Sequence, residues 1–167
     1  MPIFGVDGAA PASDTLYISY AVANDGSPST GCAGNAAARL PGGAWRVVSV
    51  FAVANQSLTC DTFPAGPNPP GPVPIAANVV AMRVSYLSVA GTGAVTYFAN
   101  ANAVNTAGGN WSTINGVQVC LELAGDNTQA SYPTSNTFTD CDGTTANPTD
   151  GRIHRTVRNT FFLRNPL

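Results

Sequence analysis

Apolar and polar residues alternate through much of this chain, and this pattern most constrains its fold. Residues 14–22 place an apolar side chain at every second position, as a half-buried strand does. Related patterns, alternating or rich in β-branched and aromatic residues, mark five further candidate strands: 44–53, 78–89, 94–100, 116–125 and the segment from Ile153 onward. No helical period exceeds two turns, and residues 108–115 have room for one helical turn. The sequence therefore predicts a mainly antiparallel β domain.

Two segments interrupt the strands. Residues 61–74 contain six prolines, and because proline cannot donate to a β-ladder, we expect an irregular connector there. Residues 56–60 precede it and are expected to pair with 44–53 through a turn at Ala54 and Asn55. Residues 126–151 are rich in Asn, Thr, Asp and Gly and are expected to be mostly loop, with a short edge strand near residues 137–139.

The composition fits one domain over residues 1–167 with a substantial core. Hydrophobic residues make up 44% of the chain, whereas charged residues make up only 10%, well below the ~25% of typical soluble domains. This balance is common in secreted or cell-surface β-rich proteins. The net charge of −2 selects no class of partner. The sequence has neither an apolar run of 18 residues nor a recognisable signal peptide.

Four cysteines, at positions 32, 60, 120 and 141, are too widely spaced for a structural zinc site. They predict two disulfides, for which three pairings exist. We favour Cys32–Cys60 with Cys120–Cys141, because these pairs lie in separate halves of the chain. Each would stabilise the fold by about 3.5 kcal/mol in the chain-entropy model. Disulfides imply an oxidising compartment.

Four of the seven arginines lie in the closing stretch DGRIHRTVRNTFFLRNPL, which alternates as a strand does. Direct DNA binding is disfavoured, because the chain has no lysine to extend a basic surface and aspartates lie nearby in sequence. The arginines are expected to be solvated or ion-paired on a strand. The alternative is that Arg155, Arg158 and Arg164 contribute to a subunit interface.

No motif supports catalysis, and we expect that the protein is not an enzyme. His154 is the only histidine and lacks a recognisable nucleophile motif, so it is expected to be an ordinary surface residue. Asp140 and Asp142 resemble the start of a calcium loop, but no glutamate follows at the twelfth position. An Asx-turn loop closed by Cys141 is preferred, and no cofactor is expected.

Aromatic residues offer one further candidate site. Trp45 and Trp111, with Tyr86, Tyr97 and Phe98, could form a platform for sugars, but they lie in strand-like segments. Packing in the core is the preferred interpretation.

Three ordered segments resemble one family: SDTLYISYA (13–21), VVAMRVSYLSV (79–89), and NWSTINGVQVCLELAG (110–125), which leads to the closing GRIHRTVRNTFFLRN (151–165). Their order is similar to that of the soluble part of PilW-type minor pilins of type IV pili. The resemblance covers nearly the whole chain. The proline-rich segment 61–74 and the sparse charge depart from the family pattern.

The resemblance implies an α+β pilin-like fold, mainly β in this sequence, preceded in the complete protein by an apolar membrane helix. It implies a bacterial surface protein, anchored in the inner membrane before assembly into a fimbrial pilus. Its partners would be other minor pilins in a priming or tip complex, and a large tip adhesin. Twitching motility, cell adhesion and DNA uptake would follow from the pilus. The alternatives are a J-type pseudopilin of type II secretion and an extracellular carbohydrate-binding or adhesin domain.

Overall fold

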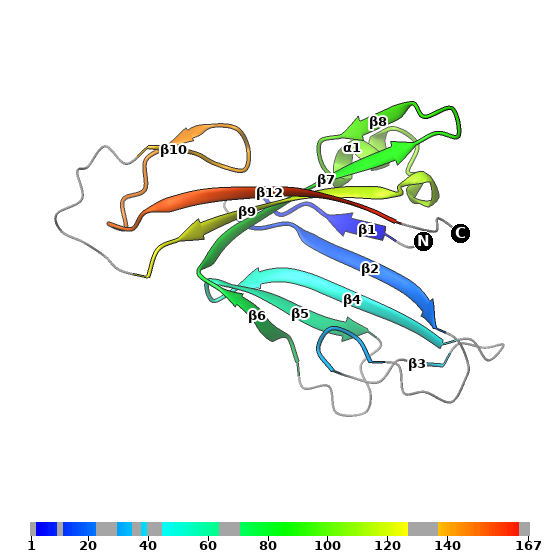
Figure 1. Cartoon of the computed structure of the whole chain (residues 1–167), viewed down its shortest axis with the longest axis horizontal. Coiled ribbons are helices and arrows are strands. Elements are labelled where there is room, and N and C mark those ends of the chain that lie inside the picture. Colours follow the sequence, from blue (N-terminus) through cyan, green and yellow to red (C-terminus); the bar gives the residue numbers. More distant parts are fainter. Residues whose placement is uncertain are drawn as a thin grey trace.

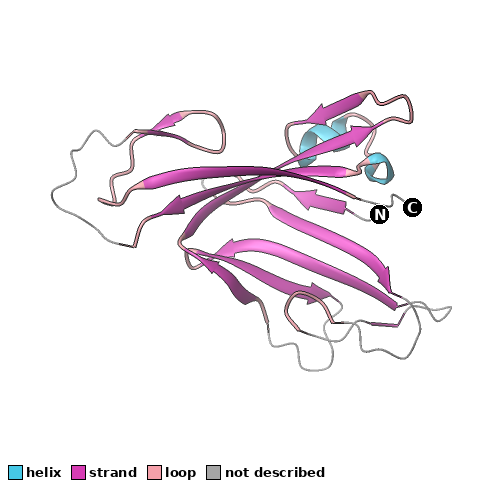
Figure 2. Cartoon of the chain, in the orientation of Figure 1, coloured by secondary structure: helices cyan, strands magenta, loops and turns pink. Residues whose placement is uncertain are grey.

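The computed structural model of the chain describes residues 3–9, 12–22, 30–34, 38–39, 45–63, 71–126 and 137–163. The strands are β1 (Ile3–Val6), β2 (Thr15–Val22), β3 (Ala38–Arg39), β4 (Trp45–Ala54), β5 (Ser57–Phe63), β6 (Val73–Ala77), β7 (Val79–Val89), β8 (Val95–Phe98), β9 (Gly116–Ala124), β10 (Phe138–Thr139), β11 (Thr145–Ala146) and β12 (His154–Phe162). Helix in these residues is limited to α1 (Ala101–Thr106) and the 3₁₀ turn η1 (Trp111–Thr113). Figure 2 shows how strongly strands dominate.

Two antiparallel sheets form the body of the domain. The six-stranded sheet has the order β1-β2-β4-β5-β6, with β3 also paired to β4. The four-stranded sheet has the order β12-β9-β7-β8, and β10 and β11 form a separate small ribbon. In Figure 1, β9 and β12 lie along one side of the molecule and β2 and β4 along the other.

The chain passes from one sheet to the other at Asn78, between β6 and β7 (Figure 1). Asn78 has φ of +62°, a left-handed conformation that asparagine tolerates better than most residues. The Ala124 amide donates to its carbonyl at 2.9 Å, and the Val79 amide donates to the Gln56 carbonyl at 3.1 Å. Backbone bonds therefore tie this corner to the ends of both sheets.

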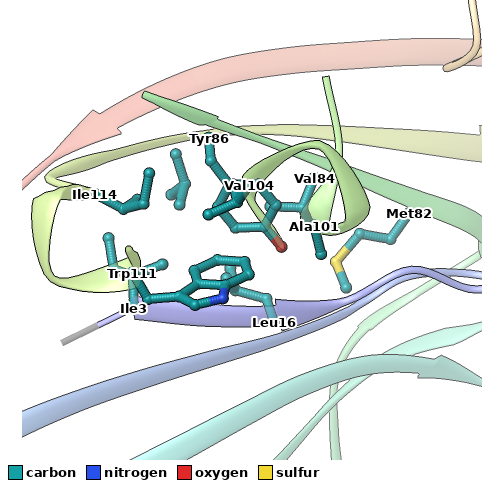
Figure 3. Packing of buried hydrophobic residues seen from close by; sticks show 10 residues of the cluster. Ile3, Leu16, Met82, Val84, Tyr86, Ala101, Val104, Trp111 and Ile114 are labelled. Carbon is teal, nitrogen blue, oxygen red and sulfur yellow. The ribbon is translucent and has the colours of Figure 1, made fainter. Parts of the chain in front are cut away.

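The hydrophobic core lies at one end, where β1, β2, β7 and β9 meet α1 and η1. Figure 3 shows the indole of Trp111 beside the ring of Tyr86, with centroids 5.0 Å apart in an edge-to-face arrangement. Both rings are buried, as are Ile3 and Met82. The start of α1 is held by Asp7, whose two carboxylate oxygens each accept a backbone N–H at 2.7 Å, from Ala101 and Asn102.

Most of the predicted strands are confirmed, and so is the mainly antiparallel β architecture. The α+β class is only partly supported, because the described residues contain so little helix. The irregular connector over residues 61–74 is wrong at both ends, since β5 continues to Phe63 and β6 begins at Val73. Strand β1 was not predicted. It pairs with β2 and buries Ile3 in the core, although four residues are too few for a clear pattern.

Candidate functional site

An apolar groove lies between the facing sides of the two sheets. Its volume is about 520 Å³. The six-stranded sheet contributes side chains from β2, β4 and β5, and the four-stranded sheet contributes side chains from β7, β9 and β12. The lining residues are Leu16, Ile18, Phe51, Leu58, Met82, Val117, Val119, Leu121, Val157, Asn159 and Phe161. Ten of these eleven side chains are apolar, so the groove suits a hydrophobic occupant.

The opposite face of the four-stranded sheet is polar and is crossed by the loop that carries Asp140 and Asp142. The Cys120–Cys141 disulfide joins this loop to β9, with the two Cα atoms 5.7 Å apart. The Asp142 carboxylate accepts from Nε of Arg83 at 3.0 Å. A polar cavity of about 430 Å³ lies beside these contacts, lined in part by Tyr97 and Arg158.

Both predicted disulfides are present. Besides the bond to Cys141, Cys32 is joined to Cys60, with a Cα–Cα distance of 6.0 Å. The Asx-turn interpretation of the Asp140 loop is also confirmed, since Oδ1 of Asp140 accepts the amides of Asp142 at 3.0 Å and Thr144 at 2.8 Å. Nowhere in the described ranges do three or more His, Cys, Asp or Glu residues gather as metal ligands would. Within this loop, Asp140 stabilises the turn and Asp142 forms the ion pair with Arg83.

The arginines near the C-terminus differ from one another in their contacts. Arg152 donates to Gln56 Oε1 at 2.7 Å, and its other contacts are Asn78 and the carbonyls at the end of β9. Arg158 donates from Nη2 to the carbonyls of Asp140 and Cys141, both at 3.0 Å. Arg155 is exposed, and Arg164 lies outside the described residues. The structure thus leaves the interface assignment of Arg155 and Arg158 as a prediction.

His154 is not a surface residue, contrary to expectation. It is only 8% exposed, and its ring contacts Phe138 with centroids 5.2 Å apart. Nδ1 lies 2.8 Å from a Glu122 carboxylate oxygen, and Nε2 lies 3.1 Å from Asp150. Slight burial of Asp150 raises the pKa of its carboxyl. The hydrogen bond to His154, the bond from the Arg152 amide and the positive charges of both residues lower it by more, so the pKa of Asp150 lies below its ordinary value. The sequence pattern missed this network because its acids come from β9 and from a loop.

A buried acid, Asp14, joins the start of β2 to the four-stranded sheet. Its carboxylate accepts the amides of Val84 at 2.8 Å and Gly8 at 3.0 Å. Burial raises the pKa of Asp14, while these two bonds and the charge of Arg83 partly oppose the change. Burial likewise raises the pKa of the Tyr86 phenol, and the charges of Asp14 and Asp7 add to the effect. Asp14 and Tyr86 therefore belong to the packed interior of the domain.

The described aromatic residues of the candidate sugar platform do not share one exposed surface. Tyr86 and Trp111 are buried in the core, which confirms the preferred interpretation for them. Tyr97 is exposed on β8, and Phe98 is partly buried against the core. The side chain of Trp45 lies outside the described part of the structure. Tyr86 and Trp111 therefore have no exposed ring face on which a sugar could stack.

The site and fold define a disulfide-linked β domain with an apolar groove between the facing sides of its two sheets. The family model described as Type IV Pilus-assembly protein W matches residues 46–165, and the chain belongs to this PilW family. Among solved structures, a type IV-like pilin from Thermus thermophilus is similar, with 14% identity and a TM-score of 0.47 over 96% of this chain and 84% of that chain. A search of curated proteins finds no match.

Family membership makes the chain a pilus-related minor pilin and implies contacts with other pilus components. Together with the two disulfides, it indicates a protein of the cell surface or periplasm. None of the described helices has the length and apolar character needed to cross a membrane. Sequence reasoning missed the groove, because its walls come from six strands whose facing is set by the tertiary fold.

Proposed function

We propose that this domain is a structural subunit of the type IV pilus priming or tip complex and works by assembly rather than catalysis. The observation that carries the proposal is the apolar groove in a member of the PilW family. In this proposal, an apolar helix that precedes the domain in the complete protein packs into the groove. The sheets then present their outer surfaces to other minor pilins and to a large tip adhesin.

The exposed positions of the groove support this arrangement. Val157 is 51% exposed and Phe161 is 54% exposed, although both side chains belong to an otherwise apolar wall. Burying apolar surface is worth about 25 cal/mol per Å², so covering these side chains with a helix stabilises the complete subunit. Motility, adhesion and DNA uptake would be consequences of the assembled pilus.

The contacts of His154 favour assembly over acid–base catalysis. Carboxylates of Glu122 and Asp150 occupy its two ring nitrogens. A general base needs a nitrogen within reach of the substrate proton, and here both nitrogens face protein acids. We propose no catalytic role for this network.

The test is complementation of a gene deletion with full-length variants. Phe161→Asp introduces a charge into the groove wall at a half-exposed position and is expected to reduce surface pili by about tenfold or more. Val95→Asp is the matched control, because Val95 is 57% exposed on β8, outside the groove. Normal piliation in the deletion strain would contradict the proposal. Loss of protein secretion with intact pili would favour the pseudopilin alternative.

A further inference from the structure

Strand β12 forms an open edge of the four-stranded sheet, since β9 is its only partner in the sheet order. At its two ends, the Gly125 amide donates to the Ile153 carbonyl and the Leu163 amide donates to the Asn115 carbonyl, both at 2.8 Å. In an antiparallel ladder, the direction of backbone bonding alternates along the strand. Odd-numbered residues therefore bond toward β9, and even-numbered residues direct their backbone groups outward.

The hydrogen bond of one outward amide agrees with this alternation. The amide of Thr160 donates to Oδ1 of the neighbouring Asn159 at 2.9 Å rather than to β9. The Thr156 hydroxyl donates to the carbonyl of Thr139 in β10. Beyond Thr156, the outward backbone groups belong to Arg158, Thr160 and Phe162. An added strand would hydrogen-bond to these groups.

The other sheet edges are less suited to receive a strand. Strand β6 contains Pro74, which has no amide hydrogen to donate. Strand β8 has only four residues, and β1 contacts α1 and η1. Among the described strands, β12 therefore combines length, free backbone groups and an absence of proline.

The side chains of β12 indicate the chemistry of a partner strand. Phe162 is 56% exposed on the face opposite the groove, and an apolar or aromatic side chain across from it on an added strand would form a favourable cross-strand pair. In the described ranges, neither Arg155 nor Arg158 forms an ion pair with a carboxylate. A second copy of β12 would bring only further arginines to this edge, and like charges across a sheet are unfavourable.

We propose that β12 receives an extended strand from another minor pilin of the same pilus, with acidic side chains beside Arg155 and Arg158. This inference rests on the proposed function, because it names the surface through which the subunit joins its neighbour. The added strand continues the four-stranded sheet. Binding displaces the Asn159 side chain from the Thr160 amide and leaves that amide bonded to the partner backbone.

The experiment measures binding of the purified domain to purified soluble domains of the minor pilins encoded with it. Thr160→Pro removes an outward amide hydrogen but no backbone bond to β9, and is expected to weaken binding about tenfold. It also removes the bond from Gln118 Nε2 to the Thr160 hydroxyl, so Thr160→Ala, which removes that bond but keeps the amide, is expected to bind like the wild type. Arg158→Glu reverses the charge beside the partner acids and is expected to weaken binding most at low salt. Thermal unfolding of each variant checks that the fold is retained.

The matched control is Val95→Pro on β8, the opposite edge of the same sheet. The Ala90 amide donates to the Ala94 carbonyl, so even-numbered residues of β8 bond inward and the Val95 amide points outward. Val95→Pro should therefore bind like the wild type.

Full binding by folded Thr160→Pro would overturn the inference while leaving the proposed function intact. Failure of the wild type to bind any of these minor pilins would contradict the proposed function itself. Concentration-dependent dimers abolished by Thr160→Pro would instead identify a second copy as the occupant.

Discussion

The phenol oxygen of Tyr86 lies directly against the backbone of Gly5. A Cβ atom added at Gly5 would lie 1.6 Å from this oxygen and 2.7 Å from the ring carbon that bears it. Only glycine allows β1 to approach β7 this closely. The pair explains why the short strand β1 can pack over the buried ring.

Gly5→Ala is expected to lower the free energy of unfolding by about 3 kcal/mol, because the Tyr86 ring must move within a packed core. Gly91→Ala is the matched control. Gly91 has no atom within 4 Å of an added Cβ, so its substitution should change stability by less than about 0.5 kcal/mol. Chemical denaturation of both variants makes the measurement. Equal effects would show that β1 does not pack as described.

Tyr86→Phe should be neutral or stabilise the fold by up to about 1 kcal/mol. The Tyr86 hydroxyl is buried and has no hydrogen-bond partner, and an unsatisfied buried hydroxyl is costly. The same change should partly restore Gly5→Ala, because it removes the nearer of the two clashing atoms. A loss above about 1 kcal/mol on substitution would indicate that the hydroxyl is satisfied in solution.

Asp14 and Asp150 should give stability contributions of opposite pH dependence. Asp14 has a pKa above its ordinary value of 3.8, so its contribution is fully present below pH 3.8 and is lost as the pH rises through its folded-state pKa. Asp150 has a pKa below 3.8, so its contribution is present above pH 3.8 and is lost as the pH falls through its folded-state pKa. Denaturation of the wild type, Asp14→Asn and Asp150→Asn across this range measures both. Because Asp150 is partly exposed, its effect should weaken in salt; parallel pH curves would refute the assignment.

Replacing His154 should remove the contacts that its ring makes with the carboxylates of Glu122 and Asp150. His154→Phe keeps a ring beside Phe138 but removes both contacts to Glu122 and Asp150. We expect the pKa of Asp150 to rise toward its ordinary value and the domain to lose about 2 kcal/mol of stability. NMR titration of the Asp150 side chain makes the first measurement. An unchanged Asp150 pKa would mean that Arg152 alone controls it.

Removing the Cys120–Cys141 disulfide should destabilise the domain by about 3 kcal/mol. The double change Cys120→Ala and Cys141→Ala should also loosen the Asp140 turn, because that turn is joined to β9 by this bond. Hydrogen exchange at the amides of Asp142 and Thr144 reports the local effect. Removal of the Cys32–Cys60 bond is the control, and it should leave these two amides protected.

Local patterns predicted most strands of this fold, because alternation reports directly on a half-buried strand. The pairing of cysteines was also predictable, since each pair lies close in sequence. The groove and the environment of His154 were not predictable from such patterns. Glu122 and His154 are separated by 32 positions and meet only because β12 pairs with β9. Likewise, Asp7 holds the start of α1 from 94 positions away.

The side chain of Arg152 connects the two sheets at the corner between them. Its guanidinium contacts Gln56 beside the six-stranded sheet and the carbonyls that end β9 in the four-stranded sheet. Strand β7 extends from this corner for 11 residues, or roughly 36 Å at the usual rise per residue. A rotation of about 5° at the corner therefore moves the far end of β7 by roughly 3 Å. We therefore expect the contacts of Arg152 to influence the angle between the two sheets.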